Sequence, residues 1–365
     1  MREKGGELMR GRTRGAVAVA TMVVLTVSGG GVAFADDLSP KDIYERAAPS
    51  TVHVIGTYGA GTGVVYDADK GLIVTNAHVV QGEPSLRVAV EDRAPVPARL
   101  LGIDPCEDLA VLTFSHAQPD LKEAKFGDSK DVAFADNVTA LGYPESIEAQ
   151  GAQKPVFTTG AVQNPDVKDS APDATLPRYP STIQHSATIN PGNSGGPLLN
   201  GKAEVVGINT LSLQGGGTQG QFYAISSDHV RPLLDQLAAG DRKNDPGWQL
   251  VDLKNPNLAD YFAEEDAAKV AQTQKALKDV DGMMVVYTMT NSPAYKAKLG
   301  SGDVITAMKD TSVASLAEVC DVLQSAAPGE TVPVDGVYSP VNADGKEMKS
   351  GEGWSTDLVI GKDKQ

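Results

Sequence analysis

Residues 190–198 read Asn-Pro-Gly-Asn-Ser-Gly-Gly-Pro-Leu, a serine set among glycines. A serine hydroxyl is a weak nucleophile at neutral pH and needs a neighbouring base to take its proton. The glycines on both sides of Ser194 let the backbone turn tightly and bring N–H groups close to it. Such N–H groups can bind the oxyanion that forms when a carbonyl is attacked. This stretch therefore predicts a nucleophilic serine in a tight loop that ends in a strand.

Two earlier segments carry the partners that such a serine needs. Residues 75–80 read Thr-Asn-Ala-His-Val-Val, and residues 104–112 read Asp-Pro-Cys-Glu-Asp-Leu-Ala-Val-Leu. An imidazole can act as the base, and a carboxylate on its other nitrogen fixes the tautomer and stabilises the imidazolium. His78, Asp108 and Ser194 are therefore the candidates for a hydrolytic triad.

The glycines around Ser194 also satisfy G-x-S-x-G, the nucleophile elbow of α/β-hydrolases. That fold requires a helix after the serine, with the acid and then the histidine further along the chain. Here Pro197 and Leu198 begin a strand instead, and the only later histidine is His229. Chain order and context therefore exclude the elbow.

Short β-branched runs separated by turn residues surround these segments. The predicted strands are 51–55, 63–66, 72–75, 86–90, 97–102, 108–114, 137–142, 156–162, 181–185, 203–209 and 220–225. Many short strands at this spacing indicate a sandwich or barrels rather than βαβ units. Residues 67–71 are a predicted hairpin connection, and residues 164–180, rich in Asp, Pro and Ser, a predicted exposed loop. A helix is expected from Ser227 to Leu237.

Composition narrows the class of protein. The chain has 365 residues and a formal net charge of −15, which argues against nucleic acid or an anionic membrane as partner. Its length predicts two domains. The two cysteines, Cys106 and Cys320, are too few for a disulfide scaffold or a zinc or iron–sulfur site. We expect both to pack in the interior, with a bridge between them as the less favoured alternative.

Residues 1–35 have the pattern of an export signal. Basic residues lie between positions 2 and 14, an apolar stretch covers 16–27, and Ala33-Phe34-Ala35 offers a small-x-small cleavage site. Cleavage after Ala35 is predicted; the alternative is an uncleaved anchor, which Gly29-Gly30-Gly31 would interrupt. We therefore expect an exported protein, extracellular or in the cell envelope.

The three segments, in the order His, Asp, Ser, resemble trypsin-like serine proteases of the HtrA (high-temperature-requirement) class. The likeness extends through residues 126–129 and 206–210 and covers about 45 to 238. It implies a mainly β fold in which two six-stranded barrels enclose the site in the cleft between them. It also implies an endopeptidase for unfolded or damaged proteins, without metal or cofactor and often trimeric. ATP independence is expected because the sequence has no Walker-type glycine loop.

The same resemblance implies a role for each candidate residue. His78 would be the general base and acid, Asp108 the carboxylate that orients it, and Ser194 the nucleophile. The backbone N–H groups of Gly192 and Ser194 would form the oxyanion hole. The alternative is a latent protease that acts mainly as a peptide-binding or holdase module.

The residues that would form the S1 pocket contain no carboxylate. In trypsin-like folds this pocket is built just before the nucleophile and on the strand that follows it. Thr188 stands six positions before Ser194, where an enzyme specific for Arg or Lys would carry an acid. With Ile189, Leu211 and Leu213 nearby, we predict a shallow apolar pocket that prefers small aliphatic P1 residues.

A second domain resembles a bacterial PDZ domain, an α+β fold that binds extended C-terminal peptides. The likeness lies in residues 283–287, 292–294 and 299–305. It departs from the pattern at Leu250, where the carboxylate-binding loop usually has a glycine. An insertion at 255–279 is expected to form an extra helix pair. A structural or regulatory lid is the alternative to peptide capture.

The sequence patterns also predict the boundaries of the domains. The expected divisions are a signal peptide at 1–35, a protease domain at 36–240, a linker at 241–247 and a PDZ-like domain at 248–362. The clearest predicted helix of the second domain covers 315–325, where apolar residues recur at helical spacing.

Overall fold

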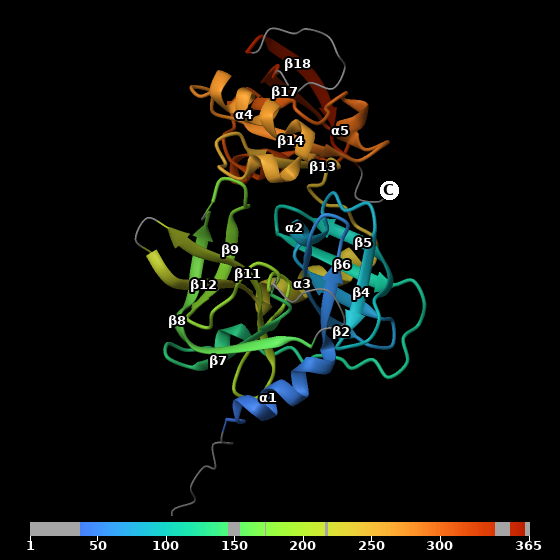
Figure 1. The fold of residues 1–365 in the computed structure, drawn as a ribbon, viewed down its shortest axis with the longest axis vertical. Helices are drawn as coiled ribbons and strands as arrows, with labels where there is room; N and C mark the ends of the chain where they lie inside the picture. The colour runs from blue at the N-terminus through green and yellow to red at the C-terminus, as the bar shows by residue number, and fades with distance from the viewer. Residues whose placement is uncertain (1–36, 145–153, 172, 216–217, 340–350, 362–365) are drawn as a thin grey trace, which may run out of the picture. The chain divides into compact units, whose positions relative to one another are not determined.

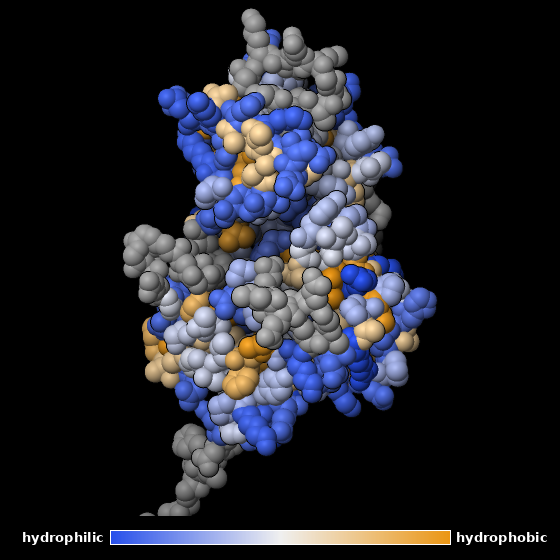
Figure 2. All heavy atoms as spheres, viewed as in Figure 1, coloured by the Kyte–Doolittle hydropathy of each residue, from blue (hydrophilic) through white to orange (hydrophobic). Residues whose placement is uncertain are grey.

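The computed structural model describes residues 37–144, 154–171, 173–215, 218–339 and 351–361 (Figure 1). The predicted signal peptide and its cleavage site therefore lie outside the described residues. Within the described ranges, no helix has both the length and the apolar character needed to cross a membrane. The face seen in Figure 2 is mostly hydrophilic, with apolar residues confined to scattered patches.

The first half of the protease region is a closed barrel of six strands. Their order is β1-β2-β3-β6-β5-β4. The strands are β1 (Thr51–Ile55), β2 (Ala60–Asp67), β3 (Leu72–Thr75), β4 (Leu86–Val90), β5 (Val96–Asp104) and β6 (Leu109–Phe114). Gly71 closes the predicted β2–β3 hairpin with φ +64°, a conformation that favours glycine. Valines, isoleucine and leucine from alternate strand positions fill the interior.

A second closed barrel follows, in the order β10-β11-β12-β9-β8-β7. Its strands are β7 (Asn137–Gly142), β8 (Val156–Ser170), β9 (Tyr179–His185), β10 (Pro197–Leu199), β11 (Val205–Gly215) and β12 (Thr218–Ser226). The prediction of two six-stranded barrels is confirmed. Short helices join or flank the strands: α1 (Pro40–Ala47), η1 (Ala48–Ser50), α2 (Ala77–Val80), η2 (Ser129–Asp131) and α3 (Ser227–Ala238).

The expected exposed loop at 164–180 is wrong over most of its length. β8 runs on to Ser170, and β9 already begins at Tyr179, so the two strands form a long hairpin with Ser170 paired to Tyr179. Neighbouring strands satisfy each other's backbone groups, so polar side chains can occupy the outer face of such a hairpin. The polar composition that suggested a loop reflects this exposed face.

The C-terminal region is an antiparallel sheet in the order β13-β14-β15-β17-β18, with β16 paired to β15. Its strands are β13 (Trp248–Asp252), β14 (Met283–Thr288), β15 (Val304–Met308), β16 (Thr311–Ser312), β17 (Thr331–Val337) and β18 (Gly353–Val359). Its helices are η3 (Leu258–Tyr261), η4 (Glu264–Asp266), α4 (Ala267–Ala276), α5 (Pro293–Lys296) and α6 (Leu316–Ser325). The predicted helix at 315–325 is α6, capped by the Ser315 side chain. The insertion at 255–279 holds one α-helix and two 3₁₀ turns rather than a helix pair.

The segment predicted as a linker is packed against the first barrel. Ile103 donates its N–H to the Asp241 carbonyl at 3.0 Å and accepts from the Lys243 N–H at 3.1 Å. The Asn244 side chain donates to both carboxylate oxygens of Asp104, at 3.1 and 3.2 Å. Burial raises the pKa of Asp104 to about 7, against the effect of these hydrogen bonds. The segment is thus hydrogen-bonded to the end of β5 and is not a free linker.

Cys106 and Cys320 form a disulfide bond, which corrects the expectation that both are merely packed. Cys106 follows β5 and lies two residues before Asp108, whereas Cys320 lies on α6, 214 positions away in sequence. Both are almost fully buried, in one cluster with residues of the C-terminal sheet. The disulfide therefore joins the first barrel to the PDZ-like region.

Replacing both cysteines with serine should lower the free energy of unfolding by about 2–5 kcal/mol, because the cross-link restricts the unfolded chain. Urea unfolding without reductant measures the difference from the wild type. Dithiothreitol should shift the wild-type transition toward that of Cys106→Ser/Cys320→Ser and leave the variant unchanged. Identical transitions for both proteins under oxidising conditions would contradict the prediction.

Candidate active site

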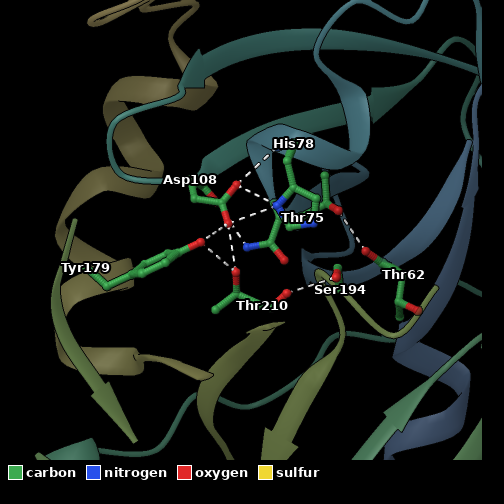
Figure 3. Close-up of polar contacts among 8 residues, drawn as sticks. Thr62, Thr75, His78, Asp108, Tyr179, Ser194 and Thr210 are labelled. Atoms are coloured by element: carbon green, nitrogen blue, oxygen red, sulfur yellow. Dashed lines mark hydrogen bonds and ion pairs between the residues drawn. The ribbon is translucent and has the colours of Figure 1, made fainter. Parts of the chain in front are cut away.

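The three candidate residues come from different elements and from both barrels (Figure 3). His78 lies on α2, directly after β3, and Asp108 lies in the turn between β5 and β6. Ser194 lies in the loop between β9 and β10 of the second barrel. The site is therefore assembled across the junction of the two barrels.

His78 and Asp108 are held together by several hydrogen bonds. The ring Nδ1 of His78 lies 2.9 Å from Oδ1 and 3.0 Å from Oδ2 of Asp108. The backbone N–H of His78 donates to Oδ1 at 3.1 Å. The Asn76 side chain donates to the Asp108 carbonyl at 3.0 Å. Asp108 is 1% exposed, whereas 35% of the His78 side chain is open to solvent.

The electrostatics of this pair keep Asp108 ionised and favour the protonated form of His78. Burial lowers the pKa of His78, but the charge and hydrogen bond of Asp108 outweigh it, so that pKa is raised above its ordinary value. Burial raises the pKa of Asp108, but His78 and the other hydrogen bonds outweigh it, and that pKa is lowered. Asp108 is thus ionised at neutral pH and accepts from Nδ1, which leaves Nε2 of His78 to take a proton.

Ser194 faces the same cavity as His78 but is not hydrogen-bonded to it. Its hydroxyl donates to the Thr210 carbonyl at 3.0 Å. Among the described residues, Nε2 of His78 has no hydrogen-bond partner. Both side chains line a cavity of about 710 Å³. Hydrogen bonds between a nucleophile and its base are often absent without substrate, so the missing contact does not argue against a triad.

The loop around Ser194 is tied to the first barrel. Thr62 donates its N–H to the Ser194 carbonyl at 2.8 Å and its hydroxyl to the Gly192 carbonyl at 2.7 Å. A Cβ on Gly195 would lie 2.1 Å from the Thr62 carbonyl oxygen, so only glycine fits there. In the described part of the chain, the N–H groups of Gly192 and Ser194 have no acceptor. Both donors are therefore available to an oxyanion.

The predicted S1 residues differ in their exposure to solvent. Thr188 is exposed and accepts a hydrogen bond from Thr158 at 2.7 Å. Ile189 is 3% exposed and packs in the core of the second barrel. Leu211 and Leu213 lie on β11, but their side chains fall outside the described residues.

Two family models match this chain, one in the region of the two barrels and one in the C-terminal sheet region. The model of a trypsin-like peptidase domain matches residues 61–208, and the model of a PDZ domain matches residues 247–336. "Serine protease Do-like HtrA" of Lactobacillus helveticus is 32% identical over 80% of this chain and 67% of its own length. The chain belongs to the HtrA family of trypsin-like serine proteases. The resemblance inferred from the motifs is confirmed.

Other HtrA relatives are longer than this chain. The protein of the same name in Bacillus subtilis (strain 168) is 32% identical, and the match covers 80% of this chain but 62% of that protein. A "Probable periplasmic serine endoprotease DegP-like" of Marinomonas sp. is 33% identical over 79% of this chain and 55% of its own length. The chain thus spans about three fifths of the first of these relatives. The solved structure of "HtrA-type protease AlgW with tripeptide" gives a TM-score of 0.49 and 23% identity, covering 88% of this chain and 96% of that chain.

Two further residues of this site were not predicted from the sequence. Tyr179 and Thr210 both place a hydroxyl against Oδ2 of Asp108, at 2.9 and 2.8 Å. Thr210 ends the stretch whose likeness to the family was noted, but its side chain was not singled out. Tyr179 lies in the segment predicted as an exposed loop, and no sequence motif marks it. Among the described residues, no group of three or more His, Cys, Asp or Glu could hold a metal ion.

We expect Asp108→Asn to fold but to lower kcat/KM by on the order of 10⁴, because an amide favours the wrong imidazole tautomer. The wild-type acid limb should have an apparent pKa above the ordinary value of a histidine, because His78 must be neutral and Asp108 stabilises its charged form. The measurement is kcat/KM on a peptide substrate against pH. Loss of the negative charge should move the residual acid limb to lower pH, and an unmoved limb with unchanged rate would contradict the assignment.

Proposed function

We propose that this protein is an ATP-independent serine endopeptidase that cleaves unfolded or damaged polypeptides. The observation that carries the proposal is the ionised Asp108–His78 pair: His78 lines the same cavity as Ser194, and its Nε2 has no partner among the described residues. The backbone N–H groups of Gly192 and Ser194, which have no acceptor in the described part of the chain, could bind an oxyanion. This combination of acid, base, alcohol and donors suits acyl transfer.

The mechanism follows from these positions. The Ser194 hydroxyl turns from the Thr210 carbonyl to Nε2 of His78, which takes its proton as Oγ attacks the substrate carbonyl. The N–H groups of Gly192 and Ser194 stabilise the resulting oxyanion. His78 then gives its proton to the leaving amine, and an acyl-enzyme remains. Water, deprotonated by His78, releases the second product and restores Ser194.

The lining of the cavity supports an unfolded substrate. Tyr58, from the β1–β2 connection, is 81% exposed, and Tyr261, at the end of η3, is 42% exposed. Both line the cavity that holds His78 and Ser194. Folded proteins bury most large apolar side chains, so exposed aromatic walls favour chains that have lost their fold.

The PDZ-like sheet offers β13 as an edge strand to which an extended peptide could add. Two backbone groups of β13 already have partners in the protease region. The Trp248 carbonyl accepts from the Gln81 side chain at 2.7 Å, and the Asp252 N–H donates to the Thr175 hydroxyl at 3.5 Å. We propose that C-terminal peptides bind only by displacing these contacts. Homo-oligomerisation, including a trimer, remains part of the proposal by family analogy.

We also propose that the protein is exported. The N-terminal signal pattern with cleavage after Ala35 supports this location, and relatives named as periplasmic proteases agree with it. Exported proteins commonly keep structural disulfides, so the Cys106–Cys320 bond fits the same compartment.

Ser194→Ala should abolish casein digestion, because no other group in the mechanism can form the acyl-enzyme. The wild type should digest casein without ATP and react with a fluorophosphonate probe, and the variant should do neither. A wild type that binds unfolded casein but neither cleaves it nor reacts with the probe would instead support the latent, holdase alternative.

Small aliphatic P1 residues should be preferred, because the Thr188 position offers no carboxylate to pair a basic side chain. A library of fluorogenic peptides that differ only at P1 measures the preference as kcat/KM. We expect Val and Ala to exceed Lys and Arg. Faster cleavage after Lys or Arg would disprove this specificity without bearing on the triad.

A further inference from the structure

We propose that Tyr179 is a positioning residue for the active site: its phenol hydroxyl holds the Asp108 carboxylate in the orientation that His78 requires. The proposal rests on the proposed function in one respect, since it takes Asp108 and His78 as partners in catalysis. The contacts on which it is built belong to this chain and do not depend on that activity.

The geometry places the Tyr179 hydroxyl directly on the buried carboxylate (Figure 3). It donates to Oδ2 of Asp108 at 2.9 Å and lies 2.9 Å from the Thr210 hydroxyl. Thr210 donates to the same Oδ2 at 2.8 Å. Tyr179 is 0% exposed and Asp108 1% exposed. Two hydroxyls thus converge on Oδ2, while His78 donates both N–H groups to Oδ1 and its Nδ1 also lies 3.0 Å from Oδ2.

The Asp108 carboxylate is therefore bound from both barrels. His78 of the first barrel donates both its N–H groups to Oδ1, and its Nδ1 also lies 3.0 Å from Oδ2. Oδ2 is bound by Tyr179 on β9 and Thr210 on β11, both in the second barrel. Ser194 lies between β9 and β10 of that same barrel. Tyr179 thus links the acid–base pair of the first barrel to the barrel that carries Ser194.

Tyr179 is suited to act as a permanent donor. Burial, and next the negative charge of Asp108, raise the pKa of its phenol well above the ordinary value. Asp173 also raises it, from the connection between β8 and β9. The phenol therefore keeps its proton throughout the pH range in which His78 titrates. With Asp108 ionised, that proton points to Oδ2.

The hydroxyl affects His78 in a direction that can be measured. Its dipole places a partial positive charge against Asp108 and offsets part of the negative charge that His78 feels. Removing the hydroxyl should raise the pKa of His78 and move the acid limb of activity to higher pH. Loss of orientation should lower kcat on the order of tenfold to a hundredfold, the effect of one hydrogen bond to a buried charge, with little change in KM.

Tyr179→Phe in the full chain is the test, and Tyr66→Phe is its matched control. Tyr66 lies on β2, and its buried hydroxyl has no partner in the described part of the chain. We expect Tyr179→Phe to lower kcat and shift the acid limb upward, and Tyr66→Phe to do neither. Unchanged kcat and an unmoved limb in folded Tyr179→Phe would overturn the proposal. Reduced stability alone, without a shifted limb, would also overturn it, since packing then explains the residue.

A second measurement separates this proposal from the proposed function. The pKa of His78 can be read by NMR on protein with labelled histidines; the chain has five, and His78→Gln assigns the signal. A higher pKa in Tyr179→Phe supports the positioning role even if no peptidase activity is found, whereas an equal pKa refutes it. Should Tyr179→Phe fail to fold, a fluorotyrosine at position 179 is a stronger donor and should lower the pKa of His78; no change would refute the role.

Discussion

The architecture of the site depends on one buried negative charge. The Asp108 carboxylate is almost completely removed from water, which is costly unless hydrogen bonds replace its hydration. Its donors come from α2, β9 and β11, so the charge is satisfied only when both barrels close around it. With the barrels apart, Asp108 would lose the hydroxyls of Tyr179 and Thr210 and keep only its contacts within the first barrel.

The dependence between the barrels is mutual. The second barrel supplies the hydroxyls that bind Asp108, and the first barrel supplies Thr62, which binds the loop of Ser194. The Thr62 hydroxyl also accepts the N–H of Tyr143 from the second barrel, while its carbonyl accepts from Thr75. Each barrel therefore positions the reactive residue of the other, and neither half of the site is complete within one barrel.

The sequence predicted those features that depend on neighbours along the chain. The hairpin at 67–71, helix α6 and the strand-rich pattern rest on local turn chemistry and periodicity, and the structure confirms them. The triad segments were found because their residue types are chemically constrained. The Cys106–Cys320 bond was only the less favoured alternative, because the sequence does not show what brings together two cysteines 214 positions apart. Tyr179 was missed for a related reason: its polar surroundings describe the outer face of a hairpin, and its partner lies in another barrel.

The segment that carries Asp108 is fixed residue by residue. Ile103 is bound by the segment after α3, and Asp104 by Asn244. Cys106 is bonded to α6, and Glu107 lies 2.6 Å from a ring nitrogen of His229. Asp108 itself adopts φ +50°, a left-handed conformation that surrounding contacts must maintain.

Ser194, by contrast, is restrained at its hydroxyl by a single hydrogen bond to the Thr210 carbonyl. Asp108 and His78 are therefore held together in the absence of substrate, whereas the proposed attack requires the Ser194 side chain to rotate away from the Thr210 carbonyl. The energy barrier to rotation about one side-chain bond is small compared with the barrier to rebuilding a loop. A substrate carbonyl placed against the N–H groups of Gly192 and Ser194 would favour that rotation, because it positions the carbon that the serine oxygen attacks.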